Sequence, residues 1–189
     1  MKRWLVLMAG LAVFGGQIAK AEPLKPDILF LMPDEMRGDC LSVLGHPAVR
    51  TPQLDEQIVP LIAEFKERSR KARRPWVILF TADHGEMLGD HGFFQKCEPF
   101  EGSANIPFLV AASPELGFKA GMRSLQPVCL EDVMPTLLEL AGARCPKPMD
   151  GVSLVPTLRG SKQVVRECLH FEHAPCYSQK QAFHALTAE

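Results

Sequence analysis

Two short apolar runs along the chain each end abruptly in acidic or imidazole-bearing residues. The first is Asp27–Met32, followed by P-D-E, and the second is Val77–Thr81, followed by A-D-H-G-E. Short runs rich in β-branched and aromatic residues, bounded by turn residues, predict buried strands. Because open α/β sheets place their sites outside the carboxyl ends of strands, the pattern predicts that both acidic ends contribute to one site.

A helical pattern lies between these two runs. Apolar residues recur at helical spacing at Leu54, Ile58, Leu61, Ile62 and Phe65. Pro60 either kinks this helix or starts it. The basic block Lys66–Arg74 follows directly. We interpret this block as the solvated end of the helix, where cations suit the helix dipole, in preference to an anion-binding patch.

The second half of the chain alternates between the two kinds of element. Ile106–Ala112 and Cys168–Phe171 are further strand candidates, and Glu131–Ala141 shows helical apolar spacing. Pro135 is tolerated in that helix only within the first turn, and Gly142 suits its end. Strands alternating with helices favour an α/β fold, a mostly parallel sheet with helices on both faces.

The N-terminus has the pattern of a secretory signal. Lys2 and Arg3 supply the positive region, Leu5–Phe14 the apolar region, and Ala19-Lys20-Ala21 a cleavage site. The apolar region is short for a membrane span, although an uncleaved anchor is the alternative. We expect a signal peptide at residues 1–21 and a secreted or periplasmic mature domain, residues 22–189, without a membrane segment.

Composition adds two constraints. With 189 residues and a net charge of −1, the chain suits one domain and gives no indication of nucleic-acid binding. Six cysteines would meet an oxidising compartment, and their spacings match no C-x-x-C metal site. A disulfide between Cys168 and Cys176 and free buried thiols are both open. Oligomeric state is not indicated.

Three long motifs give the chain a resemblance to the sulfatase family, within the alkaline-phosphatase-like superfamily of metal-dependent ester hydrolases. They span Lys25–Asp55, with P-D-E-M-R-G-D and T-P-Q-L-D; Val77–Val110, with A-D-H-G-E-M-L-G-D-H-G; and Asp132–Gly160, with D-G-V-S-L-V-P-T-L-R-G. The tail L-H-F-E-H-A-P-C-Y is similar to secreted bacterial members, the arylsulfatases among them. The resemblance implies a truncated alkaline-phosphatase-like sandwich.

The resemblance also implies a set of site residues. Asp34, Asp83 and His84 match the family's metal ligands, and Glu35 stands where a second acid is common. Calcium is the cation that the family implies, while the imidazole leaves manganese or zinc open. Lys96 matches the lysine that contacts the ester oxygens. The residues Glu86, Asp90 and His91 are expected only to organise the loop.

One departure from the family pattern dominates the functional interpretation. Sulfatases carry their nucleophile in a C/S-x-P-x-R motif, oxidised to formylglycine, between the T-P-x-L-D and D-H-G segments. Here Thr51–Asp55 runs directly into a helix that resembles a later part of the family, so an internal deletion near residue 55 is inferred. Cys97-Glu98-Pro99 mimics the motif but lacks its arginine. No nucleophile is assigned.

Three functional hypotheses follow. The first is a sulfuric ester hydrolase by family, arylsulfatase-like, with a sulfate ester substrate but inactive without the formylglycine motif. The second is a non-catalytic metal-binding remnant or a gene fragment. The third is a phosphate or phosphonate ester hydrolase of the same superfamily, because a metal and a lysine suit either tetrahedral anion.

Overall fold

The structure, a computed structural model, describes residues 25–41, 50–173 and 183–188. Its main sheet has the order β1-β2-β3, formed by β1 (Asp27–Leu31), β2 (Trp76–Thr81) and β3 (Phe108–Ala112). These are the first three predicted strands, within one or two residues. The chain has a mixed α/β architecture with a small sheet, in agreement with the predicted fold class.

The sheet is mixed rather than mostly parallel. Strand β1 pairs parallel with β2, with Asp27 opposite Trp76, whereas β3 runs antiparallel to β2, with Val77 opposite Ala112. Residues 82–107 between β2 and β3 include only short helical turns. Parallel strands require a long crossover connection, usually a helix, so a chain without one returns in the opposite direction.

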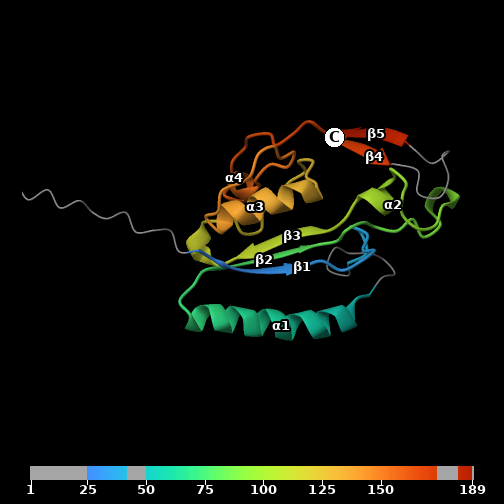
Figure 1. Cartoon of the computed structure of the whole chain (residues 1–189). Helices are drawn as coiled ribbons and strands as arrows, with labels where there is room; N and C mark the ends of the chain where they lie inside the picture. The colour runs from blue at the N-terminus through green and yellow to red at the C-terminus, as the bar shows by residue number, and fades with distance from the viewer. Residues whose placement is uncertain (1–24, 42–49, 174–182, 189) are drawn as a thin grey trace, which may run out of the picture.

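Helices cover both faces of the sheet, as the alternating pattern predicted. Helix α1 (Pro52–Lys71) lies along one face, and α3 (Val133–Leu140) and α4 (Val155–Leu158) lie on the other (Figure 1). The remaining elements are the turns η2 (Asp90–Gly92), η3 (Pro114–Leu116) and η4 (Leu130–Asp132), the short helix α2 (Glu101–Ala104), and the strands β4 (Cys168–His173) and β5 (Phe183–Ala188).

Helix α1 is longer than its apolar pattern indicated and contains Pro60 in its interior. It starts at Pro52, where proline is favoured because the first helical N–H has no partner within the helix. Its last turn is basic and pairs with acids one turn earlier, Arg68 with Glu64 at 2.7 Å. The basic block is therefore an exposed helix end, as predicted.

Helix α3 also follows its sequence signals. The turn η4 leads into α3 at Val133, which places Pro135 in the first turn. Gly142, just beyond the helix, has a φ of +65°, a backbone conformation that glycine adopts without strain. Both local predictions for this helix are confirmed.

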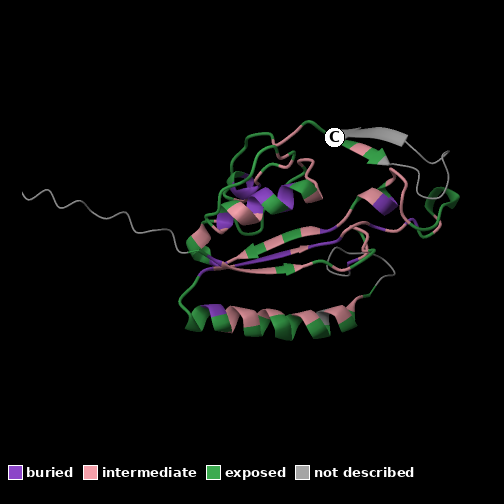
Figure 2. Ribbon diagram, in the orientation of Figure 1, coloured by how far each residue is buried: buried purple, intermediate pink, exposed green. Residues whose placement is uncertain are grey.

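The core lies between β2 and the α3–α4 face. The central strand β2 is almost entirely buried (Figure 2), and its Val77 clusters with Leu140 of α3 and Val155 of α4. Ile28 of β1 and Leu137 of α3 pack against this cluster. By contrast, the only buried residue that the structure describes in α1 is Ser69, so α1 is the less firmly packed layer.

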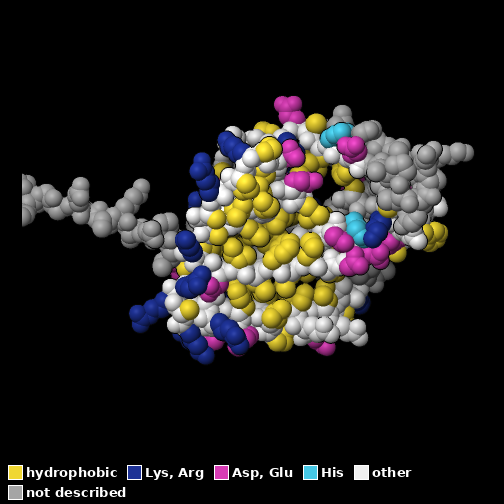
Figure 3. Space-filling model, viewed as in Figure 1, with side chains coloured by type: hydrophobic (Ala, Val, Ile, Leu, Met, Phe, Trp, Pro, Cys, Tyr) yellow, Lys and Arg dark blue, Asp and Glu magenta, His cyan; other side chains and the backbone are white. Residues whose placement is uncertain are grey.

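An open apolar groove runs between β1 and α3. Its volume is about 520 Å³, and it is lined by Ile28, Phe30, Met32, Leu130, Val133, Met134, Leu137, Leu138 and Ala141. Figure 3 shows these layers as a broad field of apolar side chains. Phe30, Met32 and Met134 are 40%, 50% and 51% exposed. Exposed apolar residues are ordinarily scattered singly, and large contiguous apolar patches are unusual on soluble monomers.

The predicted fourth strand exists but joins a different sheet. Strand β4 pairs antiparallel with β5, with Cys168 opposite Ala188, in a separate two-stranded hairpin. The five cysteines in the described ranges form no disulfide with one another. Cys176 and residues 1–21, where a signal peptide is expected, lie outside those ranges. No helix among the described residues is long and apolar enough to cross a membrane.

Candidate functional site

Two loops meet at one edge of the sheet because β1 and β2 run parallel. Residues 32–41 follow β1 and carry Asp34 and Glu35, while residues 82–97 follow β2 and carry Asp83, His84 and Lys96. Figure 3 shows acidic, basic and histidine side chains gathered at this end of the sheet. The structure thus brings together the two strand ends that the apolar runs predicted would meet.

Asp83 links the two loops. Its Oδ1 accepts the backbone N–H of His84 at 2.8 Å and the backbone N–H of Glu35 at 3.1 Å. Partial burial of the Asp83 carboxyl opposes ionisation, but these two N–H donors outweigh it, so its pKa lies below the ordinary value. The carboxylate is therefore charged and fixed in orientation at neutral pH.

The imidazole of His84 is oriented by its own neighbour. Its Nδ1 lies 2.9 Å from the carbonyl oxygen of Gly85, which can only accept, so Nδ1 carries the proton. The Nε2 atom then faces the acids, with Asp83 Oδ2 at 3.2 Å and Asp34 Oδ1 at 3.6 Å. A backbone carbonyl that fixes the tautomer in this way is typical of metal-ligating histidines.

Three potential ligand atoms converge next to Asp83. One atom each from Asp34, Glu35 and His84 lie within 4.8 Å of one another. Asp34 is 78% and His84 20% exposed, so the cluster is open to solvent on the Asp34 side. Asp83 lies beside this trio, with one oxygen engaged by the two loops and the other close to His84. All four residues predicted as metal ligands therefore lie in one place.

Lys96 extends into the same cluster. Its Nζ lies 2.7 Å from His84 Nε2 and 3.9 Å from Glu35 Oε1. The residues on either side of it, Gln95 and Cys97, have φ values of +70° and +83°, and Glu35 has +55°. Positive φ is strained for side chains of this kind, and such strain concentrates at functional sites. Three of the positive-φ residues other than glycine therefore lie where these charged groups meet.

The loop between His84 and Lys96 is held from within, as expected from its sequence. The Glu86 carboxylate accepts the backbone N–H of Gln95, and the His91 ring stacks on Phe100 with centroids 4.3 Å apart. Gly85 has no space for a side chain, because an added Cβ would lie 2.1 Å from the carbonyl oxygen of Gly102. These contacts give Glu86 and His91 structural roles.

A hollow opens beside the acidic cluster. Its volume is about 290 Å³; Asp83 and His84 line it, and Leu169 and Phe171 of β4 contribute apolar surface. Cys129 also lines it, and burial together with the nearby Glu131 and Asp132 raises the pKa of its thiol to about 12. Because the thiolate is the nucleophilic form, this raised pKa disfavours Cys129 as a nucleophile.

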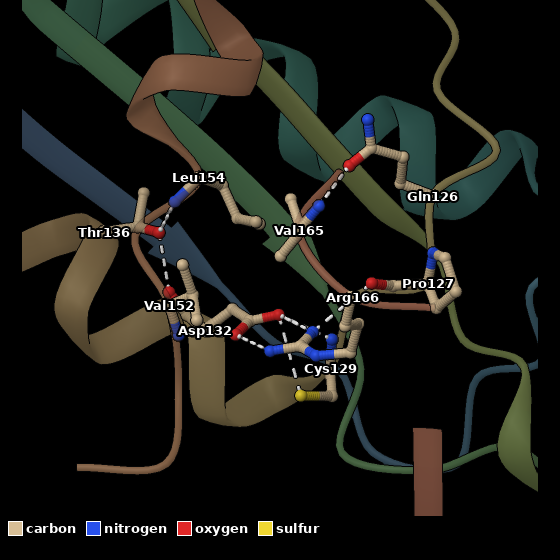
Figure 4. Close-up of polar contacts among 9 residues, drawn as sticks. All are labelled: Gln126, Pro127, Cys129, Asp132, Thr136, Val152, Leu154, Val165 and Arg166. Carbon is tan, nitrogen blue, oxygen red and sulfur yellow. Dashed lines mark hydrogen bonds and ion pairs between the residues drawn. The ribbon is translucent and has the colours of Figure 1, made fainter. Parts of the chain in front are cut away.

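A second polar cluster, built on Asp132, was not predicted from the sequence. The fully buried Asp132 accepts hydrogen bonds from Nη1 and Nη2 of Arg166, at 2.5 and 2.6 Å, and from the backbone N–H of Val152 at 2.8 Å (Figure 4). Its burial opposes ionisation, but Arg166 and backbone donors lower its pKa below the ordinary value. The cluster joins η4 to the segment 152–166 and is structural.

Comparisons with known proteins agree with this architecture. The family described as N-sulphoglucosamine sulphohydrolase, C-terminal, matches residues 89–186. An arylsulfatase of Clostridium perfringens is 37% identical over 99 residues, which are 52% of this chain and 21% of the relative. The chain therefore spans about one fifth of the length of that relative.

Solved structures show the same relationship. One, determined in complex with its substrate D-glucosamine-2-N,6-O-disulfate, superposes with a TM-score of 0.61 at 24% identity, covering 71% of this chain and 27% of its own. A phosphonate monoester hydrolase from Silicibacter pomeroyi gives 0.54 at 34% identity, covering 62% and 22%. With the family match extending over half of its residues, the chain belongs to the sulfatase family of the alkaline-phosphatase-like superfamily.

Proposed function

We propose that this chain carries the cation-binding part of a sulfuric ester hydrolase site, and that the cation is Ca²⁺. The observation that carries the proposal is the convergence of Asp34, Glu35 and His84 within 4.8 Å beside Asp83. Calcium takes six to eight oxygen ligands, which carboxylates, carbonyls and water supply. The single imidazole keeps manganese and zinc as alternative ions, since nitrogen ligands suit both.

Lys96 and the neighbouring hollow support an ester as the ligand. A bound cation would act as a Lewis acid on an ester oxygen. The Lys96 ammonium, directed into the same cluster, would neutralise a second oxygen of the sulfate group. The hollow lined by Leu169 and Phe171 offers an apolar wall to the alcohol part of the ester.

We further propose that the chain alone does not turn over sulfate esters. No C/S-x-P-x-R segment occurs between Thr51 and Asp83, where the family carries its nucleophile. The chain would then be a cation-binding remnant of a hydrolase or a gene fragment.

Hydrolysis of an aryl sulfate by purified protein, coexpressed with a formylglycine-generating enzyme, tests the proposed lack of turnover. Turnover that Asp83→Ala abolishes would refute it. Genomic DNA around codon 55 shows whether a segment has been lost.

A phosphate or phosphonate ester is the second candidate ligand. It is favoured by the similarity, at 34% identity, to a phosphonate monoester hydrolase. The D-G-V-S-L-V-P-T-L-R-G segment and the match to the sulphohydrolase family favour sulfate. Competition between sulfate and phenylphosphonate for the calcium-loaded protein separates the two, and tighter binding of phenylphosphonate would reverse the preference.

The cation site itself is tested by thermal melting with and without millimolar calcium. Because calcium binds the folded state, it should raise the melting temperature of the native protein by mass action. Asp34→Ala and Asp83→Ala should lose most of that increase, whereas Glu115→Ala, an exposed acid of η3 beside the start of β2 and so at the opposite end of the sheet, should keep it. Equal increases in all four proteins would reject the assignment.

Export is proposed from the N-terminal pattern. Cleavage after Ala21 should give an exported protein that begins at Glu22. N-terminal sequencing of the periplasmic or secreted fraction checks this, and a soluble exported protein that still begins at Met1 would contradict it.

A further inference from the structure

Arg37 connects the two loops of the candidate cation site. Its Nε and Nη2 clasp the Asp39 carboxylate of its own loop, each at 2.9 Å. Its Nη1 crosses to the other loop and donates to Asp90 Oδ2 at 2.7 Å, and to the carbonyl oxygens of Glu86 and Met87 at 3.3 Å. A single guanidinium therefore holds together segments about fifty residues apart in sequence.

The position of this contact relative to the ligands gives it a specific consequence. Asp34 and Glu35 lie two or three residues before Arg37, and His84 lies two residues before Glu86. Any opening between Arg37 and the Glu86–Asp90 turn would separate the acidic pair from the imidazole. The convergence of these ligand atoms should therefore be more sensitive to loss of the Arg37 contact than the rest of the fold is.

The surroundings require an arginine and leave little freedom to replace it. The Arg37 side chain is only 15% exposed, although Asp39 and Asp90 are about half exposed. An added Cβ at Gly102 in α2 would lie 3.2 Å from Arg37 Nη1, so α2 packs against the guanidinium. A planar fork can serve Asp39 on one side and three acceptors on the other, which the point charge of lysine cannot do.

We infer that Arg37 is a positioning residue for the cation site: it holds the Asp34–Glu35 loop against the His84 loop so that their ligand atoms converge. The expected effect on cation affinity rests on the proposed function, cation binding at this site. The closure of the two loops by Arg37 is expected in the cation-free protein as well.

Hydrogen exchange of the Glu35 amide tests the closure without any cation. That N–H donates to Asp83 Oδ1 across the two loops. In Arg37→Met and Arg37→Lys it should exchange several-fold faster than in the native protein, while amides of β2 keep their protection, because only the local opening changes. Equal acceleration in β2 would show a merely global destabilisation and overturn the inference, as would an unchanged Glu35 amide.

Calcium and manganese titrations by calorimetry test the consequence. Both Arg37 variants should bind either ion about 10- to 100-fold more weakly, the range found when groups that orient metal ligands are removed. Restored affinity in Arg37→Lys would show that charge alone matters and would contradict a positioning role. The control Arg68→Met removes an exposed arginine on α1 that pairs with Glu64 and should bind as the native protein does.

The two experiments separate the inference from the proposed function. A native protein that binds neither ion, combined with faster Glu35 exchange in the Arg37 variants, rejects the cation site but keeps the loop closure. Native binding that the Arg37 variants retain in full rejects the inference and keeps the cation site.

Discussion

A cation bound at the proposed site would compete with Lys96 for His84, so we expect removal of Lys96 to strengthen cation binding. The Lys96 Nζ lies 2.7 Å from His84 Nε2, the nitrogen that a bound ion would take, and 3.9 Å from Glu35 Oε1. A cation at this position must displace the ammonium or tolerate it nearby. Lys96→Met keeps the length of the side chain and removes the charge.

The expected magnitude follows from charge and distance. Two unit charges 4 Å apart interact by about 1 kcal/mol in water, so a dication and an ammonium repel by about 2 kcal/mol. The repulsion is stronger near a protein surface than in water, but Lys96 is 39% exposed and its stem is flexible, so solvent and movement relieve much of it and we take the water value as the net effect. We expect a gain of about 1–2 kcal/mol, which corresponds to about 5- to 30-fold tighter binding.

Isothermal titration of Ca²⁺ and Mn²⁺ into both proteins measures the effect. The control is Lys71→Met, at the far end of α1 from the site, where Lys71 is 70% exposed and pairs with Glu67 at 3.6 Å (Figure 1). If Lys96 also binds the ester, the calcium-loaded variant should bind sulfate more weakly than the native protein. Cation affinity that is unchanged in Lys96→Met, or lower than in the control, would refute the reasoning.

Three further predictions concern stability. Arg166→Met should lower the free energy of unfolding by about 3–5 kcal/mol in urea denaturation, because it leaves the buried Asp132 charge unpaired; a change no larger than that of Arg68→Met would contradict this. Because the folded-state pKa of Asp132 is lowered, its contribution is present above its unfolded pKa of about 3.9 and lost as pH falls through the folded value. Asp132→Asn should therefore flatten the loss of stability below about pH 4, measured by melts across pH. Gly85→Ala should fold poorly or lose the calcium response, because its Cβ would overlap the Gly102 carbonyl, whereas Gly117→Ala meets nothing within 4 Å and should cost only the strain of its positive φ.

Local patterns were sufficient to predict most elements and the meeting of the two acidic strand ends. The apolar runs gave β1, β2 and β3, and the acids after β1 and β2 converge because parallel strands end at one edge. The direction of β3 was wrong because it depends on the connection, whose lack of a crossover helix cannot be read from the strand itself.

Long-range pairing was the part that the sequence could not predict. Asp132 precedes an amphipathic helix, and an acid at such a position ordinarily caps the helix. The partner of Asp132, Arg166, lies 34 residues later in an irregular segment. Arg37 was visible only as part of an R-x-D motif. Its contact with Asp90, 53 residues away, emerges once β1 and β2 bring their loops together.

The apolar groove between β1 and α3 has a practical consequence for any solution work on this chain. Sulfate and phosphate salts strengthen the burial of apolar surface, because they are excluded from it. Phe30, Met32 and Met134 would then drive molecules together as sulfate is added. The anion used as competitor in the assays would thus also favour self-association of this protein. Anion titrations should use matched chloride and dilute protein, with light scattering recorded alongside, so that self-association is not read as binding.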